Sequence, residues 1–198
     1  MTLANPGLMS LTLAAYGWMP QDWEQCFYPE DLPSTWRLGY YCNEFNEVLV
    51  PAAAWGTGAL SDDWSVLPVG FDLYLEINLA LLQSAHWVQV RECIETVLAQ
   101  HINGLWVDTA ARAHLPADWE QRFSVHEALN DALLAQMPAE ANAQLALLRT
   151  GHTLTAVALR ELFEQLREQT AHKDVVLFLD APYPVVAQIQ LMRQIYNI

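Results

Sequence analysis

The sequence has 198 residues, with 23 acidic side chains against 9 basic ones and a formal net charge of −14. Such a charge repels nucleic-acid phosphates and anionic lipids, so we expect neither nucleic acid nor a membrane as a partner. Hydrophobic residues make up 53% and charged residues 16%, which excludes a disordered chain and predicts a single folded domain over residues 1–198.

Cysteine usage and the first residues bear on the compartment. Cys26, Cys42 and Cys93 are widely spaced and form neither a zinc nor a disulfide pattern. The opening residues MTLANPGLMSLTLAAYG lack the basic region and cleavage site of a signal peptide. Apolar runs stay well short of the ~20 residues that a membrane-spanning helix needs. These features predict a cytoplasmic protein with reduced cysteines.

The first half of the chain alternates short apolar runs with helical patterns. Gly17 and Pro51 close two of the apolar runs, as turn residues close buried strands. The apolar residues Val90, Ile94, Val97 and Leu98 recur at helical spacing. The predicted elements are a strand at 11–18, a helix at 34–45, a strand at 46–51, a loop at 52–68, a strand at 71–78 and a helix at 87–101.

The second half continues the same alternation. Its clearest helix carries apolar residues at spacings of three and four, and its clearest strand is the nearly continuous run VVLFLDAP. The predicted elements are a strand at 105–109, a polar connection at 110–122, a strand at 123–129, a weak helix at 130–143, a strand at 144–151, a helix at 155–173, a strand at 175–182 and a helix at 184–198.

This alternation predicts an α/β fold with a parallel sheet and right-handed crossovers. An open doubly wound sheet and a barrel both agree with this alternation of strands and helices. A full eightfold barrel takes about 250 residues, so a barrel of this length is shortened, to about seven strands.

One stretch of sequence carries a family resemblance. It lies mostly in the first fifty residues and continues more loosely to the last two strands. The matching residues are Gly17-Trp18, Trp23, Phe27-Tyr28-Pro29, Leu32-Pro33, Tyr40-Tyr41, Phe45-Asn46, Trp64, Pro68 and Gly70-Phe71. In this pattern the chain resembles the proteins of domain of unknown function 72, the YecE-like family. The resemblance implies a parallel, TIM-like β/α barrel and no particular activity.

The chain departs from that family at polar positions. Glu76 stands where the family usually has lysine, and Pro51-Ala52-Ala53-Ala54 replaces Asn-Ser-Phe-Tyr. Val125-His126-Glu127 replaces Phe-Arg-His, and Leu179-Asp180 replaces Asn-Asn. The apolar scaffold is kept while the polar groups are exchanged. We therefore expect a divergent and shortened member, non-catalytic or of unassigned activity, that binds a small molecule or a protein.

Functional groups in parallel β/α folds lie at the carboxyl ends of the strands. Four carboxylates at such positions are the candidate catalytic residues: Glu76, Asp108, Glu127 and Asp180. Crowded carboxylates raise each other's pKa, so one could serve as a general acid in a glycosidase-like hydrolase. His126 with two carboxylates could instead hold a divalent metal for metal-assisted hydrolysis. A third interpretation is a structural ion-pair network closed by Arg149.

Five further residues are candidates for binding a ligand. Arg149 could hold an anionic group, His126 could donate or accept a hydrogen bond, and the aromatic rings could stack on a sugar or a planar ring. Alternatively, the rings fill the top of the barrel and His126 is a core residue. The candidate ligand-binding residues are Tyr16, Trp18, Trp55, His126 and Arg149.

The sequence assigns no metal or cofactor. It has no phosphate-binding glycine loop, no GxSxG nucleophile elbow and no HExxH motif. The last predicted helix carries Val186, Ile189, Met192 and Ile195, an apolar set that could pack on a second copy to form a homodimer.

Overall fold

In the part of the chain that the structure describes, seven parallel strands follow the seven apolar runs of the sequence, in the order β5-β4-β3-β2-β1-β7-β6. The computed structural model describes residues 10–19, 23–24, 26–57, 64–128, 133, 143–169 and 174–196. Each predicted strand overlaps an observed one. The strands are β1 (Leu11–Tyr16), β2 (Glu47–Val50), β3 (Asp72–Ile77), β4 (Ile102–Asp108), β5 (Val125–Ala128), β6 (Ala143–Arg149) and β7 (Asp174–Asp180).

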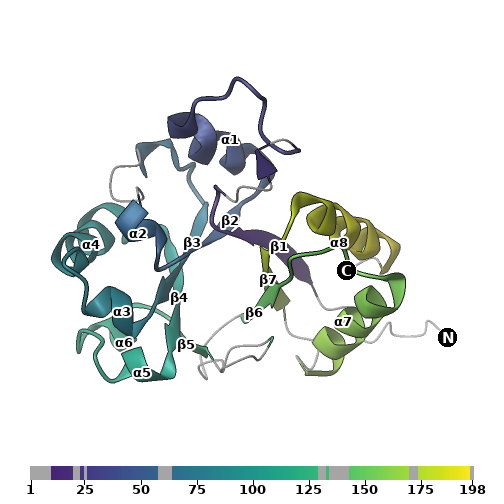
Figure 1. Ribbon diagram of the computed structural model, residues 1–198. Helices are drawn as coiled ribbons and strands as arrows, with labels where there is room; N and C mark the ends of the chain where they lie inside the picture. Colours follow the sequence, from purple (N-terminus) through teal and green to yellow (C-terminus); the bar gives the residue numbers. More distant parts are fainter. Residues whose placement is uncertain are drawn as a thin grey trace.

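The sheet curls into a nearly closed barrel with helices around it (Figure 1), which confirms the predicted fold class. Tyr74 on β3 and Phe178 on β7 show the curvature, because their ring centroids lie 5.1 Å apart although β2 and β1 separate the two strands. Among the described residues, β5 and β6 do not pair with each other. Leu133 lies at the free edge of β6, where its carbonyl accepts a hydrogen bond of 2.8 Å from the Leu147 N–H.

Two apolar cores lie on the two faces of this curved sheet. The larger one fills the space between the strands and the outer helices. The smaller one fills the barrel interior, where side chains at alternate strand positions meet. The interior core consists of Ala14, Leu49, Tyr74, Trp106, Leu145, Leu147, Val176 and Phe178.

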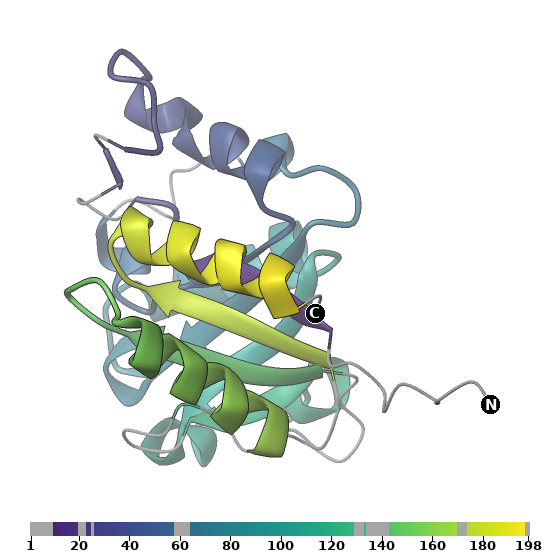
Figure 2. The same cartoon turned by 90° about the vertical axis from the view of Figure 1, so that its right-hand side faces the viewer.

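The helices lie outside the barrel, and the longest two cover one side of it. Figure 2 shows α7 and α8 running beside β6 and β7. None of the described helices is long and apolar enough to cross a membrane. The helical segments are η2 (Ser34–Trp36), α1 (Arg37–Glu44), α2 (Ala54–Thr57), η4 (Trp64–Val66), α3 (Leu79–Leu82), α4 (Trp87–Cys93), the π-helical η5 (Ile94–Leu98), α5 (Thr109–Arg112), α6 (Trp119–Arg122), α7 (Ala156–Gln169) and α8 (Tyr183–Tyr196).

Four predictions about connections and helices differ from the structure or lie outside the described residues. The expected loop at 52–68 contains α2 and η4, and the expected polar connection at 110–122 contains α6 and most of α5. The expected helix at 130–143 lies outside the described residues except for positions 133 and 143. The dimer face expected on the last helix is wrong for Val186 and Ile189. Both are fully buried in the core of the chain itself, so they are not accessible to a second copy.

Candidate functional site

Polar side chains from four strands meet at the carboxyl end of the barrel. Tyr16, Arg149 and Asp180 are the last residues of β1, β6 and β7, and Glu76 is the last but one of β3. Two residues earlier, each of these strands places a side chain in the interior core. Because side chains alternate along a strand, all four polar residues point toward the barrel axis above that core. We call Tyr16, Glu76, Arg149 and Asp180 the mouth cluster.

Glu76 is held in the mouth cluster by two hydrogen bonds. Its Oε2 atom accepts a hydrogen bond of 2.6 Å from the Tyr16 hydroxyl and one of 2.9 Å from the Ala52 backbone N–H. Burial first, and then the charge of Glu76, raise the pKa of Tyr16 above its ordinary value. The phenol therefore keeps its proton and remains a donor to Glu76.

Arg149 joins the two carboxylates of the cluster. Its Nη2 atom lies 3.5 Å from Glu76 Oε1, and its Nε atom lies 3.4 Å from Asp180 Oδ2. The guanidinium carbon stands 5.1 Å from the centroid of the Tyr16 ring, in cation–π geometry. The side chain of Arg149 is 55% exposed and that of Asp180 46% exposed, whereas Glu76 is 15% exposed. The cluster thus has a buried side at Glu76 and an open side at Arg149 and Asp180.

Asp108 also ends its strand, but its carboxylate caps helices. Oδ1 accepts a hydrogen bond from the Ala111 N–H in the first turn of α5, and Oδ2 accepts one of 3.3 Å from the Leu79 N–H at the start of α3. Asn78 caps α3 in the same way, through the Leu81 N–H at 2.8 Å. Such bonds satisfy backbone donors that a helix leaves free at its start. The structure therefore gives Asp108 a structural role.

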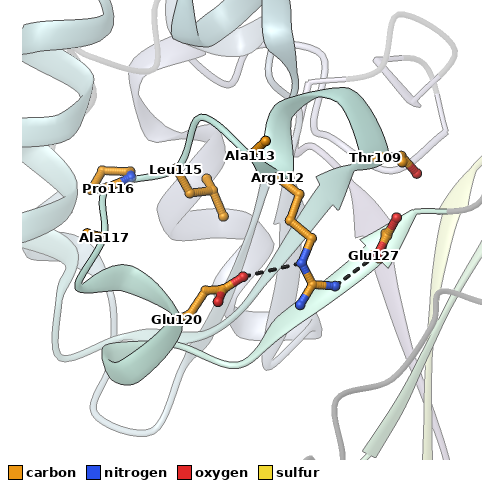
Figure 3. Close-up of a pocket in the computed structure, with 8 residues that line it drawn as sticks. All are labelled: Thr109, Arg112, Ala113, Leu115, Pro116, Ala117, Glu120 and Glu127. Carbon is orange, nitrogen blue, oxygen red and sulfur yellow. Dashed lines mark hydrogen bonds and ion pairs between the residues drawn. The ribbon is translucent and has the colours of Figure 1, made fainter.

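Glu127 lies outside the barrel, which corrects the expectation that four carboxylates share one mouth. Its register partner Val107 belongs to the outer core. Figure 3 shows Glu127 facing Arg112, whose Nη1 lies 2.9 Å from Glu127 Oε2 and whose Nε lies 3.2 Å from Glu120 Oε1. A hydrogen bond from Thr109 and the neighbouring Arg112 lower the pKa of Glu127. These residues belong to an open groove of about 610 Å³ lined by Thr109, Arg112, Ala113, Leu115, Pro116, Ala117, Glu120 and Glu127.

His126 points inward and is a core residue. It is 2% exposed, and its register partner Trp106 belongs to the interior core. Burial lowers its pKa to about 4, so the imidazole is neutral at pH 7. No group of three His, Cys, Asp or Glu side chains suited to a metal ion occurs in the part of the chain that the structure describes.

Trp18 and Trp55 are buried as well, with exposures of 2% and 1%. Both pack against Trp64, at ring-centroid distances of 5.5 and 6.0 Å. They belong to the outer core between the strands and the helices. The expected stacking surface of Trp18 and Trp55 therefore does not form at the mouth, where Tyr16 is the aromatic residue of the cluster.

One group at the mouth was not predicted from the sequence. The Ala52 N–H follows β2 and donates to Glu76. The sequence feature that points to this hydrogen bond is the run of small residues after Pro51, because small side chains leave the backbone accessible to a neighbouring side chain.

Seven parallel strands with outer helices and polar groups at the carboxyl ends of the strands define the class of a parallel β/α barrel. The solved structure of a DUF72 family protein from Thermotoga maritima shares this fold, with a TM-score of 0.57 over 93% of this chain and 99% of that chain. The two sequences are 12% identical. The sequence resemblance to the DUF72 family is thus confirmed at the level of the fold. No protein-family model and no curated protein matches the sequence.

Proposed function

We propose that the protein is a cytoplasmic, non-catalytic relative of the DUF72 proteins that binds a small polar molecule at the mouth cluster. The observation that carries this proposal is the position of Arg149. It is the half-exposed group that contacts both Glu76 and Asp180. An exposed arginine beside an exposed carboxylate offers hydrogen-bond donors and acceptors to a ligand at the same place.

The same geometry favours binding over hydrolysis. A carboxylate pair that hydrolyses a glycosidic bond flanks that bond from both sides. Here the Arg149 guanidinium stands between Glu76 and Asp180, at 3.5 and 3.4 Å from them. Glu76 is further occupied by the Tyr16 hydroxyl and the Ala52 N–H. Glu127, the other candidate acid, lies in the outer groove and pairs with Arg112.

A thermal-unfolding screen of the purified protein tests the proposal. The compounds are small carboxylic acids, amino acids, sugars and polyols at neutral pH. A ligand at one hundred times its Kd adds about 2.7 kcal/mol to the free energy of unfolding, which raises the Tm by several degrees. We expect at least one compound to do so, and we expect Arg149→Gln to abolish the shift because the variant loses the charged donors.

The matched control is Arg160→Gln on α7. Arg160 is 68% exposed, lies on α7 outside the barrel and pairs with Glu164 at 2.7 Å. This control removes the same charge and should leave the ligand-induced shift intact. If no compound raises the Tm, or if the shift survives in Arg149→Gln, the proposed function is wrong.

A further inference from the structure

Arg149 makes an ion pair with Asp180 that is longer than most of the ion pairs among the described residues. The two residues are register partners on β6 and β7, so their backbones hold them side by side. Their closest atoms are nevertheless 3.4 Å apart. Charge-assisted hydrogen bonds are typically about 2.7–2.9 Å long. Arg160 reaches Glu164 at 2.7 Å. Proximity alone therefore does not give Arg149 and Asp180 a close contact.

Arg149 has partners on a buried side and on an open side. The Tyr16 ring centroid lies 5.1 Å from the guanidinium carbon, and Glu76 approaches from within the mouth at 3.5 Å, a contact as loose as the one with Asp180. Asp180 approaches from the open side and is 46% exposed. A ligand can therefore contact Arg149 and Asp180 from solvent without disturbing the Tyr16–Glu76 hydrogen bond of 2.6 Å.

The charges of the mouth cluster limit which kinds of ligand can bind there. Glu76 and Asp180 carry two negative charges against the single positive charge of Arg149. An anion that binds to Arg149 meets two like charges nearby, and a cation that binds to Asp180 makes no use of the arginine donors. A molecule with one carboxylate and one ammonium group adds no net charge. Its binding replaces the long ion pair between Arg149 and Asp180 by two shorter ion pairs, one with each of these residues.

Resting on the proposed function, we infer that the ligand is a small zwitterion of the α-amino acid type. Its carboxylate faces the Arg149 guanidinium and its ammonium group faces the Asp180 carboxylate. The side-by-side placement of these two residues on neighbouring parallel strands matches the close spacing of the two charged groups in an α-amino acid. Tyr16 and Glu76 face Arg149 from the buried side and make no bond to the ligand.

The test uses the full chain, the individual proteinogenic amino acids, and blocked forms of whichever amino acid raises the Tm most. The blocked forms are the N-acetyl derivative, which lacks the ammonium group, and the C-terminal amide, which lacks the carboxylate. We expect each block to weaken binding about tenfold or more, because each removes a hydrogen bond to a charged group. Calorimetric titration measures the Kd of the free amino acid and of each of the two blocked forms.

The variant Asp180→Asn separates the two contacts. It should bind the free and the N-acetylated amino acid with nearly equal Kd, since the partner of the ammonium group is gone. Equal binding of free and N-acetylated forms by the unmodified protein overturns the inference. If sugars or plain carboxylic acids shift the Tm through Arg149 while amino acids do not, the inference is wrong and the proposed function stands. If nothing shifts the Tm, both are wrong.

Discussion

Glu47 and Asp72 show how single side chains set the pH dependence of this fold. They are register partners at the start of β2 and β3, so two carboxyl groups lie side by side. Burial first, and then Asp72, raise the pKa of Glu47 to about 7, and burial also raises the pKa of Asp72. Asn103 donates to Asp72 at 3.1 Å, whereas the Oε2 atom of Glu47 is buried and has no hydrogen-bond partner among the residues that the structure describes.

The unfolded chain releases the Glu47 proton near pH 4.5 and the folded chain near pH 7. Between these values the folded state holds more protons, so the free energy of unfolding falls as the pH rises. Glu47→Gln should remove much of this loss and stabilise the protein at about pH 8 by on the order of 2 kcal/mol. Urea unfolding of the variant and the unmodified protein at about pH 5 and about pH 8 measures this gain in the free energy of unfolding. Glu44→Gln, at an exposed position on α1, is the control, and an equal gain there would contradict the prediction.

Residue placement at the site was partly readable from the sequence. The end of each strand could be located, and three strand ends do contribute Tyr16, Arg149 and Asp180 to the mouth cluster. The direction of each side chain was harder to predict. His126 and Glu127 are adjacent on β5, so alternation forbids them from facing the same side. Which of them faces inward depends on the register with Trp106, and a single sequence does not contain that register.

At the scale of elements, Asp108 connects two short helices to the end of β4. It caps α5 through the Ala111 N–H and also accepts from the Leu79 N–H of α3. Asp108→Ala should therefore lower the free energy of unfolding by about 1–2 kcal/mol, at the upper end of the usual cost of losing an N-cap. Chemical denaturation measures the change.

The control for Asp108 is Asp118→Ala. Asp118 occupies the N-cap position of α6 but makes no side-chain cap bond, and it pairs with Arg122 on the exposed surface. Such an exposed surface pair contributes little to stability, so Asp118→Ala should cost less than Asp108→Ala. Equal costs for the two variants would contradict the capping role of Asp108.

Elements differ in how much of them the sequence reveals. The run of apolar residues in β7 and the three- and four-residue spacing in α7 are long enough to identify those elements. The helices α5 and α6 each have four residues, little more than one turn, which is too short for a periodic pattern to emerge. They exist because Asp108 and the packing of Trp119 hold them, and both causes are tertiary.

At the scale of the whole molecule, the curvature of the sheet decides whether a barrel forms. The alternation of strands and helices in the sequence does not determine that curvature. A flat sheet would separate β3 and β7 by three strand spacings, about 14 Å. The Tyr74 and Phe178 rings instead lie 5.1 Å apart at a 63° interplanar angle. Edge-to-face pairs of this kind contribute about 0.5–1.5 kcal/mol beyond their buried area. The contact therefore gives a direct test of closure in solution.

A double-mutant cycle on these two rings measures the closure. Tyr74→Leu and Phe178→Leu should each lower the free energy of unfolding by about 1–3 kcal/mol. The double variant should lose less than the sum by about 0.5–1.5 kcal/mol, because the ring contact is removed only once. The control cycle pairs Phe178→Leu with Phe71→Leu, since Phe71 belongs to the outer core and Phe178 to the interior one. That cycle should be additive. An additive result for Tyr74 and Phe178 as well would mean that the sheet stays open in solution, and the mouth cluster could not then assemble from strands β3 and β7.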